Sequence, residues 1–302
     1  MEIETEQPTR FKNQIKQNVD KNSKIYPYAR NLYRAYCNLA GPLHTLPDFL
    51  IIGAARSGTT SLYQYLAQHP NIEPCVVKQL HFFDEYYLRG INWYKMNFPS
   101  CWKKFMCTKI KNKKFLTGEA TPYYLQNPNA PKRIKKLNPN IKLILLLRNP
   151  VDRAFSHYKR KWKNGTEKLS FEESTEVEQN RIKGEMEKME KDENYFSRTY
   201  HSLSYISAGL YSIHLKKWLQ YFPMEQILIL ENEQFLLESQ SVYTKTLEFL
   251  ELPKFTLSNY KKFQESKSLS MDPKTRKKLI EFCKPFNEEL YDLIGKKFAW
   301  DK

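Results

Sequence analysis

Residues 49–63 constrain the fold more than any other stretch of the chain, because a strand, a short loop and a helix start follow one another there. The apolar run that opens it has the character of a buried strand and ends at Gly53. The loop contains Arg56, Gly58 and three consecutive hydroxyl residues, and an apolar pattern of helical spacing begins at Leu62. Backbone N–H groups and the positive end of the helix dipole meet in such a loop, which therefore predicts an anion-binding site.

The loop has the glycine spacing of the P-loop motif, in which a lysine reaches the nucleotide phosphates and the next hydroxyl residue binds Mg²⁺. Thr59 stands at the lysine position, and the cation, Arg56, comes earlier. The loop is thus suited to bind phosphate but lacks the lysine of ordinary phosphoryl transfer. A glycine turn without a ligand is the alternative for this segment alone. The residues predicted to bind a nucleotide here are Arg56, Ser57, Gly58, Thr59, Thr60 and Ser61.

A second apolar run, over 141–147, predicts another buried parallel strand, and it leads into Arg148. Pro150 suits the start of the following helix, and Ser156 lies about two turns into it. The planar guanidinium of Arg148 and the hydroxyl of Ser156 could share a second phosphate. An arginine at a strand end is by itself more often part of a surface ion pair. Two such loops at the carboxyl ends of strands in one sheet favour a nucleotide site.

These motifs resemble those of the sulfotransferases that use 3′-phosphoadenosine 5′-phosphosulfate (PAPS), especially the heparan sulfate N- and 3-O-sulfotransferase branch, in a soluble, bacterial-type form. Residues 53–61 resemble that family's 5′-phosphosulfate loop, and residues 148–158 resemble its 3′-phosphate motif. Further similar segments follow in the family's order up to Trp300, at 81–84, 117–124, 209–214, 218–223 and 282–290. The resemblance implies PAPS as co-substrate, adenosine 3′,5′-bisphosphate (PAP) as product, no metal, and further nucleotide contacts from Tyr211 and Lys267.

Three positions depart from the pattern of that branch. Gln79 stands where its members often carry a glutamate that acts as the base, and an amide cannot take up a proton. Ala120 replaces a lysine found in heparan-acting members. The C-terminal phosphate loop, usually Lys-Gly-Arg-like, leaves Lys267 as its cation. We therefore expect an intact nucleotide site and an altered acceptor side, which argues against a heparan-like acceptor.

His81 is the predicted general base, because Gln79 occupies the usual position and imidazole titrates near neutral pH. Asp84 is expected to orient the imidazole, and Asp84 and Glu85 are alternative bases. His157 is a weaker candidate, since its neighbouring serine is expected to face the nucleotide. A purely structural role for His81, beside two phenylalanines, is the other interpretation.

The predicted reaction is in-line transfer of the sulfonate group of PAPS to a hydroxyl or amine. The resemblance favours a saccharide acceptor, with a small-molecule metabolite as the alternative. Arg56 is the second predicted catalytic residue, because fixed donors stabilise the charge that develops on the leaving phosphate. Two other functions stay open: a nucleotide-dependent kinase or NTPase, against which Thr59 counts, and a non-catalytic PAP-binding protein, which Gln79 makes conceivable.

Composition favours one globular enzyme domain. The chain has 302 residues, 41% of them apolar, and a formal net charge of +16. Because residues 164–200 alone carry a net −4, the rest of the chain carries +20, as expected for binding anionic substrates. We expect no nucleic-acid partner, since no module or metal-ligand spacing accompanies the charge. The polar start and the lack of a long apolar run predict no membrane partner and a cytoplasmic location, and five scattered cysteines predict free thiols.

Strand-like and helical patterns alternate along the chain, which predicts an α/β fold of three layers, P-loop-like, with a central parallel sheet flanked by helices. The expected strands are 49–54, 73–76, 115–118, 142–147 and 226–231, and the expected helices 59–68, 130–137, 151–163, 209–221, 240–250 and 273–294. Residues 1–45 are expected to form an N-terminal helical arm and 46–302 the sulfotransferase domain. Within that domain, 164–200 is a charged insertion, with an exposed helix over 172–190 that is either a solvated surface or an acceptor-side lid.

Overall fold

A five-stranded parallel sheet forms the centre of the fold in the computed structural model, which describes residues 26–260 and 269–300. The strand order is β2-β3-β1-β4-β5. The strands are β1 (Phe49–Gly53), β2 (Ile72–Pro74), β3 (Leu116–Ala120), β4 (Lys142–Leu147) and β5 (Ile227–Glu231). All five predicted strands are thus present, and every neighbouring pair is parallel.

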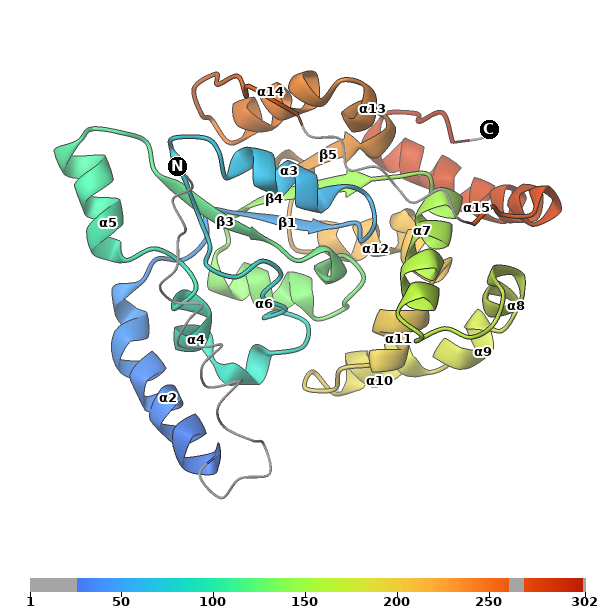
Figure 1. The fold of residues 1–302 in the computed structure, drawn as a ribbon, viewed down its shortest axis with the longest axis horizontal. Helices are drawn as coiled ribbons and strands as arrows, with labels where there is room; N and C mark the ends of the chain where they lie inside the picture. The colour runs from blue at the N-terminus through green and yellow to red at the C-terminus, as the bar shows by residue number, and fades with distance from the viewer. Residues whose placement is uncertain (1–25, 261–268, 301–302) are drawn as a thin grey trace.

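Helices cover both faces of this sheet. The α-helices are α2 (Tyr26–Ala40), α3 (Thr59–Leu66), α4 (Ile91–Lys95), α5 (Cys101–Phe105), α6 (Ala130–Leu137), α7 (Pro150–Lys163), α8 (Phe171–Glu176), α9 (Glu178–Ile182), α10 (Glu185–Lys191), α11 (Arg198–Leu203), α12 (Tyr211–Leu219), α13 (Asn232–Leu237), α14 (Ser239–Phe249) and α15 (Pro273–Ile294). Short turns of 3₁₀ helix lie at Gly41–Leu43, Tyr87–Arg89, Pro122–Tyr124, Ser207–Gly209 and Met224–Gln226, and a π-helical turn at Met106–Ile110. Figure 1 shows α3, α13 and α14 on one face of the sheet and α4, α6 and α12 on the other, which confirms the predicted three layers.

The two central strands explain why the sheet forms and where a ligand can bind. β1 is buried along its whole length and β4 along all but its first residue, as expected for parallel strands covered on both faces. β1 lies between β3 and β4, so the strand order reverses beside it. In open α/β sheets, ligands bind at the carboxyl ends of the strands at such a reversal. The loops after β1 and β4 are the two that the sequence singled out.

The N-terminal part of the chain packs against this core. α2 covers part of the predicted arm, and Cys37 on it belongs to the main hydrophobic core. His44 forms an isolated bridge with Ser100. The first 25 residues of the arm lie outside the described residues.

Two sequence-based expectations can be compared with the described residues directly. All five cysteines lie among them and none is in a disulfide, which confirms the free thiols. No helix formed by these residues has the length and apolar character needed to cross a bilayer.

Candidate active site

The loop after β1 makes a tight turn from strand to helix. Arg56 and Gly58 have left-handed backbone conformations, with φ of 74° and 86°. A side chain at Gly58 would be crowded as well as strained, because an added Cβ would lie 2.8 Å from Asn232 Nδ2. Asn232 in turn donates from Nδ2 to the Ser57 carbonyl at 2.9 Å, which fixes the loop against the segment that follows β5.

The amides and side chains of this loop divide into internal and outward groups. The amides of Ser57 and Ser61 donate to carbonyls within the loop, at 3.2 and 3.0 Å. Thr59 and Thr60 begin α3, where no preceding helical carbonyl can accept from their amides. The side chains of Ser57 and Thr59 are buried, whereas those of Arg56, Thr60 and Ser61 are partly exposed. An anion would therefore meet the amides at the start of α3 together with Arg56.

The second predicted phosphate segment lies directly against the first. Asn149 caps α7 by accepting from the amides of residues 151 and 152, which sets the direction of that helix and of Ser156 on it. Arg56 Nε donates to Ser156 Oγ at 3.1 Å, and Arg148 Nη1 donates to the Arg56 carbonyl at 3.3 Å. Tyr211 donates from its hydroxyl to the Arg148 carbonyl at 2.8 Å. Arg56, Arg148, Ser156 and Tyr211 thus form one connected group, and the remaining predicted contact, Lys267, lies outside the described residues.

Arg153 is a buried part of the site that the sequence interpretation missed, although it lies within the motif after β4. Its guanidinium is fully buried; Nη1 donates to the Ala55 carbonyl at 3.5 Å and Nη2 donates to the Tyr205 carbonyl. Burial lowers its pKa, and the neighbouring Tyr211 and Glu178 oppose that shift. Arg153 therefore ties the loop after β1 to the chain segment that follows α11.

A buried carboxylate, Glu119 at the end of β3, organises the other side of the site. It accepts hydrogen bonds from the hydroxyls of Thr121, Tyr124 and Tyr94 at 2.6, 2.8 and 2.9 Å, and from the Leu80 amide at 3.3 Å. Burial raises the pKa of Glu119, while these donors work in the opposite direction. Glu119 thereby fixes the loop around Leu80 on the end of β3, close to the loop after β1.

His81 lies in that fixed loop, beside the acid that was predicted to orient it. Its Nδ1 and Asp84 Oδ2 are 2.8 Å apart, and the backbone at Gln79 and His81 is left-handed, with φ of 59° and 50°. Burial alone would lower the pKa of His81, but the hydrogen bond and charge of Asp84, with acidic charge from Glu119 and Glu85, raise it above its ordinary 6.5. The predicted His81–Asp84 pair is therefore present in the structure.

A second histidine, His201, joins this pair from α11. Its ring stacks on Tyr123 with centroids 3.8 Å apart and lies 5.6 Å from the ring of His81. Burial lowers the pKa of His201 to about 4, so the ring is neutral at neutral pH. Asp84, Tyr123 and His201 line a cavity of about 10 Å³, enough for about one water molecule. No local sequence pattern marked His201, because only the tertiary fold brings α11 to the loop after β2.

His157, the weaker candidate base, is separated from this cavity. Its side chain is buried beside Tyr205, with ring centroids 5.3 Å apart. Burial, with the positive charges of Arg153 and Lys161, lowers the pKa of His157 well below its ordinary range. The ring is thus an uncharged packing group in α7.

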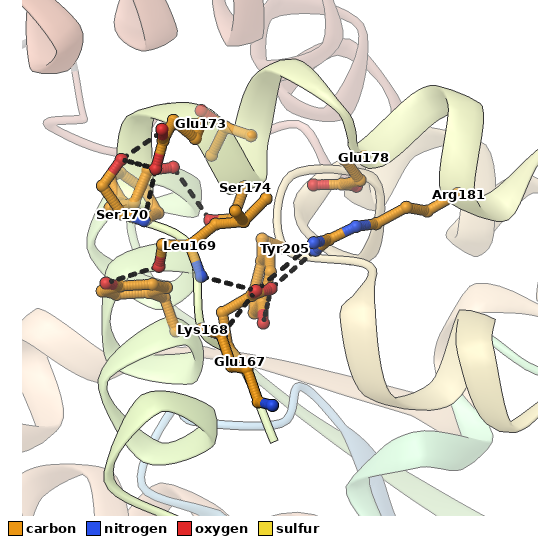
Figure 2. A network of polar contacts seen from close by, with 12 residues as sticks. Glu167, Lys168, Leu169, Ser170, Glu173, Ser174, Glu178, Arg181 and Tyr205 are labelled. Atoms are coloured by element: carbon orange, nitrogen blue, oxygen red, sulfur yellow. Dashed lines mark hydrogen bonds and ion pairs between the residues drawn. The ribbon is translucent and has the colours of Figure 1, made fainter. Parts of the chain in front are cut away.

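The insertion over 164–200 differs from the prediction of one exposed charged helix, which is wrong. In place of the helix predicted over 172–190 there are three short helices, α8, α9 and α10, and the carboxylates of Glu167, Glu178 and Glu185 are buried. Figure 2 shows Glu167 accepting from Arg181 and from the Tyr205 hydroxyl, at 2.6 and 3.0 Å. Charge counts along the sequence indicated solvation, whereas these acids are buried because arginine, tyrosine and backbone donors satisfy them.

Glu178 connects this insertion to the nucleotide side of the site. Its carboxylate accepts from the amides of Ile206 and Ser207 at 2.7 and 2.8 Å. Burial raises its pKa, against the effect of those two amides. The turn that it holds lies between α11, which carries His201, and α12, which begins at Tyr211. The insertion therefore supports both walls of the candidate site.

One group of side chains in the described ranges has the donor set for a metal ion. The potential ligand atoms of His81, Asp84 and His201 all lie within 4.8 Å of one another. Two imidazoles and a carboxylate are ligands that zinc and related ions accept. The prediction that the reaction needs no metal stays a prediction.

Known proteins that resemble this chain agree with the geometry. The sulfotransferase domain family matches residues 46–288. A membrane-associated sulfotransferase of Dictyostelium discoideum, kil1, is 29% identical, over 94% of this chain and 72% of that protein. The heparan sulfate glucosamine 3-O-sulfotransferase 3B1 of Mus musculus is 28% identical, and the match covers 85% of this chain but 65% of that enzyme. The bifunctional heparan sulfate N-deacetylase/N-sulfotransferase 1 of Caenorhabditis elegans is 30% identical, over 77% of this chain and 26% of that protein.

A solved structure gives the same result for the fold. The crystal structure of a sulfotransferase from Alicyclobacillus acidocaldarius superposes with a TM-score of 0.65 at 29% identity, covering 85% of this chain and 100% of that one. Sulfotransferases use PAPS and release PAP. Arg56, Arg148 and the amides at the start of α3 are chemically suited to bind the phosphate groups of these nucleotides. The chain belongs to the sulfotransferase family and is an enzyme that transfers sulfonate groups.

Proposed function

We propose that this sulfotransferase takes the sulfonate group from PAPS and transfers it to a hydroxyl or amine of a saccharide or a small-molecule metabolite. The observation that supports PAPS as the sulfonate donor is the contact between the two predicted phosphate-binding segments. Arg56 donates a hydrogen bond to Ser156, and Arg148 donates one to the Arg56 carbonyl. PAPS has phosphate groups at both its 5′ and 3′ positions, so it needs cationic and hydroxyl groups from two segments. Adenosine triphosphate offers phosphates for one of them only.

The proposed roles follow from the charges in the reaction. The acceptor atom attacks sulfur, the bond between sulfur and the bridging phosphate oxygen breaks, and PAP leaves with the electron pair. Arg56 and the amides of Thr59 and Thr60 would stabilise the charge on that oxygen. Arg148, Ser156, Tyr211 and Lys267 would hold the nucleotide. His81, oriented by Asp84, would take the acceptor proton.

The acceptor class rests on the relatives. Two of the relatives described above are named for heparan sulfate. Gln79 and Ala120 differ from that branch, so we propose a saccharide other than heparan sulfate. The cytoplasm is the proposed location, supported by five cysteines without a disulfide.

A mass-spectrometric screen tests this function. The full chain is incubated with PAPS and a cell extract, and the products are searched for a mass gain of one SO₃ group, with a reaction lacking PAPS as the control. We expect a PAPS-dependent gain on a hydroxyl- or amine-bearing compound. Tight binding of PAP without any such product would identify a non-catalytic binder instead, and ATP-dependent phosphate gain would identify a kinase.

A further inference from the structure

A lysine-rich segment, residues 101–114, lies between β2 and β3 in the sequence. It takes no part in the site described above. It contains six lysines and no acidic residue. Its first half is α5, which continues into the π-helical turn Met106–Ile110. The cap of α5 is Ser100, which accepts from the Lys103 amide at 3.2 Å.

Three large apolar side chains of this lysine-rich segment are exposed. Trp102 is 68% exposed, Phe105 45% and Ile110 62%. The rings of Trp102 and Phe105 stack on each other, with centroids 5.7 Å apart and planes at 24°, so they form one surface rather than two separate ones. A single exposed apolar side chain needs no explanation, but a paired tryptophan and phenylalanine beside an exposed isoleucine mark an interaction surface.

The lysines of the segment divide into two sets. Lys103, Lys104 and Lys114 fasten it to the body of the enzyme through Glu73, Asp48 and Glu251, at 2.6, 3.0 and 3.4 Å. Lys109, Lys111 and Lys113 are exposed and form no ion pair with any other residue in the described ranges. Their charges therefore remain available to an anionic partner next to the apolar side chains.

The place of the segment in the fold leaves the site accessible. Asp48 directly precedes β1 and Glu73 lies in β2, so the two ion pairs hold α5 near the amino ends of the strands. Arg56, Arg148 and His81 lie beyond the carboxyl ends. Figure 1 likewise shows α5 at one end of the sheet and α7 at the other. A large partner bound to α5 would leave the nucleotide and the acceptor free to enter.

We propose that residues 101–114 dock the enzyme peripherally on an anionic lipid bilayer. Tryptophan, phenylalanine and isoleucine enter the interfacial region, where amphipathic and apolar side chains are favoured, and lysines beside them meet acidic headgroups. A soluble polyanion would use the lysines alone and leave the paired rings in water, so the combination favours a bilayer. The expectation of no membrane partner rested on the polar start of the chain and on the lack of a long apolar run, and interfacial docking by residues 101–114 depends on neither.

Vesicle co-sedimentation of the full chain tests this proposal. Vesicles of phosphatidylcholine with about one third phosphatidylserine are compared with vesicles of phosphatidylcholine alone. We expect binding to the former only, with roughly a fivefold weaker partition for each lysine removed in Lys109→Gln/Lys111→Gln. The matched control is Lys245→Gln/Lys254→Gln, which removes the same charge from an exposed region around α14.

The apolar part is tested separately with tryptophan fluorescence. Brominated lipids should quench the wild type and Trp162→Phe, which loses another exposed tryptophan, but quench Trp102→Phe far less. Trp102→Ala/Phe105→Ala should lose vesicle binding while keeping PAP binding by calorimetry, which shows that the variant is folded. Absence of binding to the anionic vesicles would overturn the proposal. If Trp102→Ala/Phe105→Ala bound the anionic vesicles as well as the wild type does, the surface would be assigned to a soluble polyanion. Binding of dextran sulfate that needs the lysines but not the rings would give the same assignment.

Discussion

Two arginines that touch each other in the site are expected to have separable kinetic effects. Arg56 lies in the loop where charge would develop on the bridging oxygen, whereas Arg148 would hold a phosphate that does not react. We expect Arg56→Ala to lower kcat by about 100-fold with a small change in PAPS affinity. Arg148→Ala should mainly raise the KM for PAPS. Steady-state kinetics measure both, with Arg34→Ala, an exposed arginine on α2, as the control. If both variants changed only KM, these roles would be wrong.

His81 predicts a specific pH dependence. A base must be unprotonated, and Asp84 raises the pKa of His81 above 6.5. Activity should therefore rise with pH through a value above 6.5 and level off beyond it. In Asp84→Asn, the imidazolium loses its partner, so the rising limb of the pH–rate profile should move to lower pH. His81→Ala should lose turnover and keep PAP binding. A limb that stays in place in Asp84→Asn would exclude His81 as the group that titrates.

The same residues predict how metal ions affect the enzyme. None of the proposed roles needs a metal, so extensive treatment with EDTA should leave the rate unchanged. Added Zn²⁺ should inhibit, because His81, Asp84 and His201 offer it three ligand atoms and binding would occupy the base. Protons compete for the same imidazoles, so the inhibition should weaken as the pH falls. Loss of activity with EDTA that Zn²⁺ restores would instead make the metal part of the enzyme.

Among the elements, the insertion over 164–200 is predicted to stabilise the fold through its buried acids. Glu178→Ala removes the acceptor of two amides, each of which costs about 1–3 kcal/mol when left unsatisfied in a buried place. We expect chemical denaturation to show a loss on the order of 3 kcal/mol for this variant. Glu187→Ala, at an exposed position in α10, is the control and should change little. A loss of similar size in both variants would show that the buried contacts of Glu178 are not its source.

The regular elements were predictable because their patterns are local. The buried strands β1 and β4 are continuous apolar runs, and their loops carry Arg56 and Arg148 at fixed distances from them. The insertion was not predictable in this way. Whether Glu178 faces water or accepts from two amides depends on a turn almost thirty residues away in the sequence, and charge counts contain no such information.

In the candidate site, too, the features encoded by local sequence were predictable and those that depend on tertiary packing were not. The contact between Arg56 and Ser156 follows from two motifs at neighbouring strands, and the His81–Asp84 pair from three residues of spacing. His201 lies in a polar stretch without a motif, and Glu119 lies in the family-like segment 117–124, where the sequence assigned it no role. Both reach the site through packing of distant segments, which a single sequence does not reveal.

The charge of the whole molecule gives a prediction for nucleotide binding. PAP should bind far more tightly than ATP, because a 3′-phosphate adds charge-assisted hydrogen bonds of roughly 1.5–3 kcal/mol each. With a formal net charge of +16, the protein should also bind PAP more weakly as salt is added. Isothermal calorimetry at two salt concentrations measures both effects. Comparable affinities for PAP and ATP would reject the assignment of two phosphate segments.

Because α5 and the catalytic loops lie at opposite ends of the sheet, docking through α5 would hold the active site at a distance from the membrane surface. The central strands are five and six residues long, and at about 3.3 Å per residue they separate the two ends of the sheet by about 17 Å or more. If the enzyme binds the membrane through α5, its catalytic loops lie at least that far from the membrane surface. A lipid-linked acceptor too short to span this distance would not enter the active site. Only longer lipid-linked chains or freely diffusing compounds would then be sulfated.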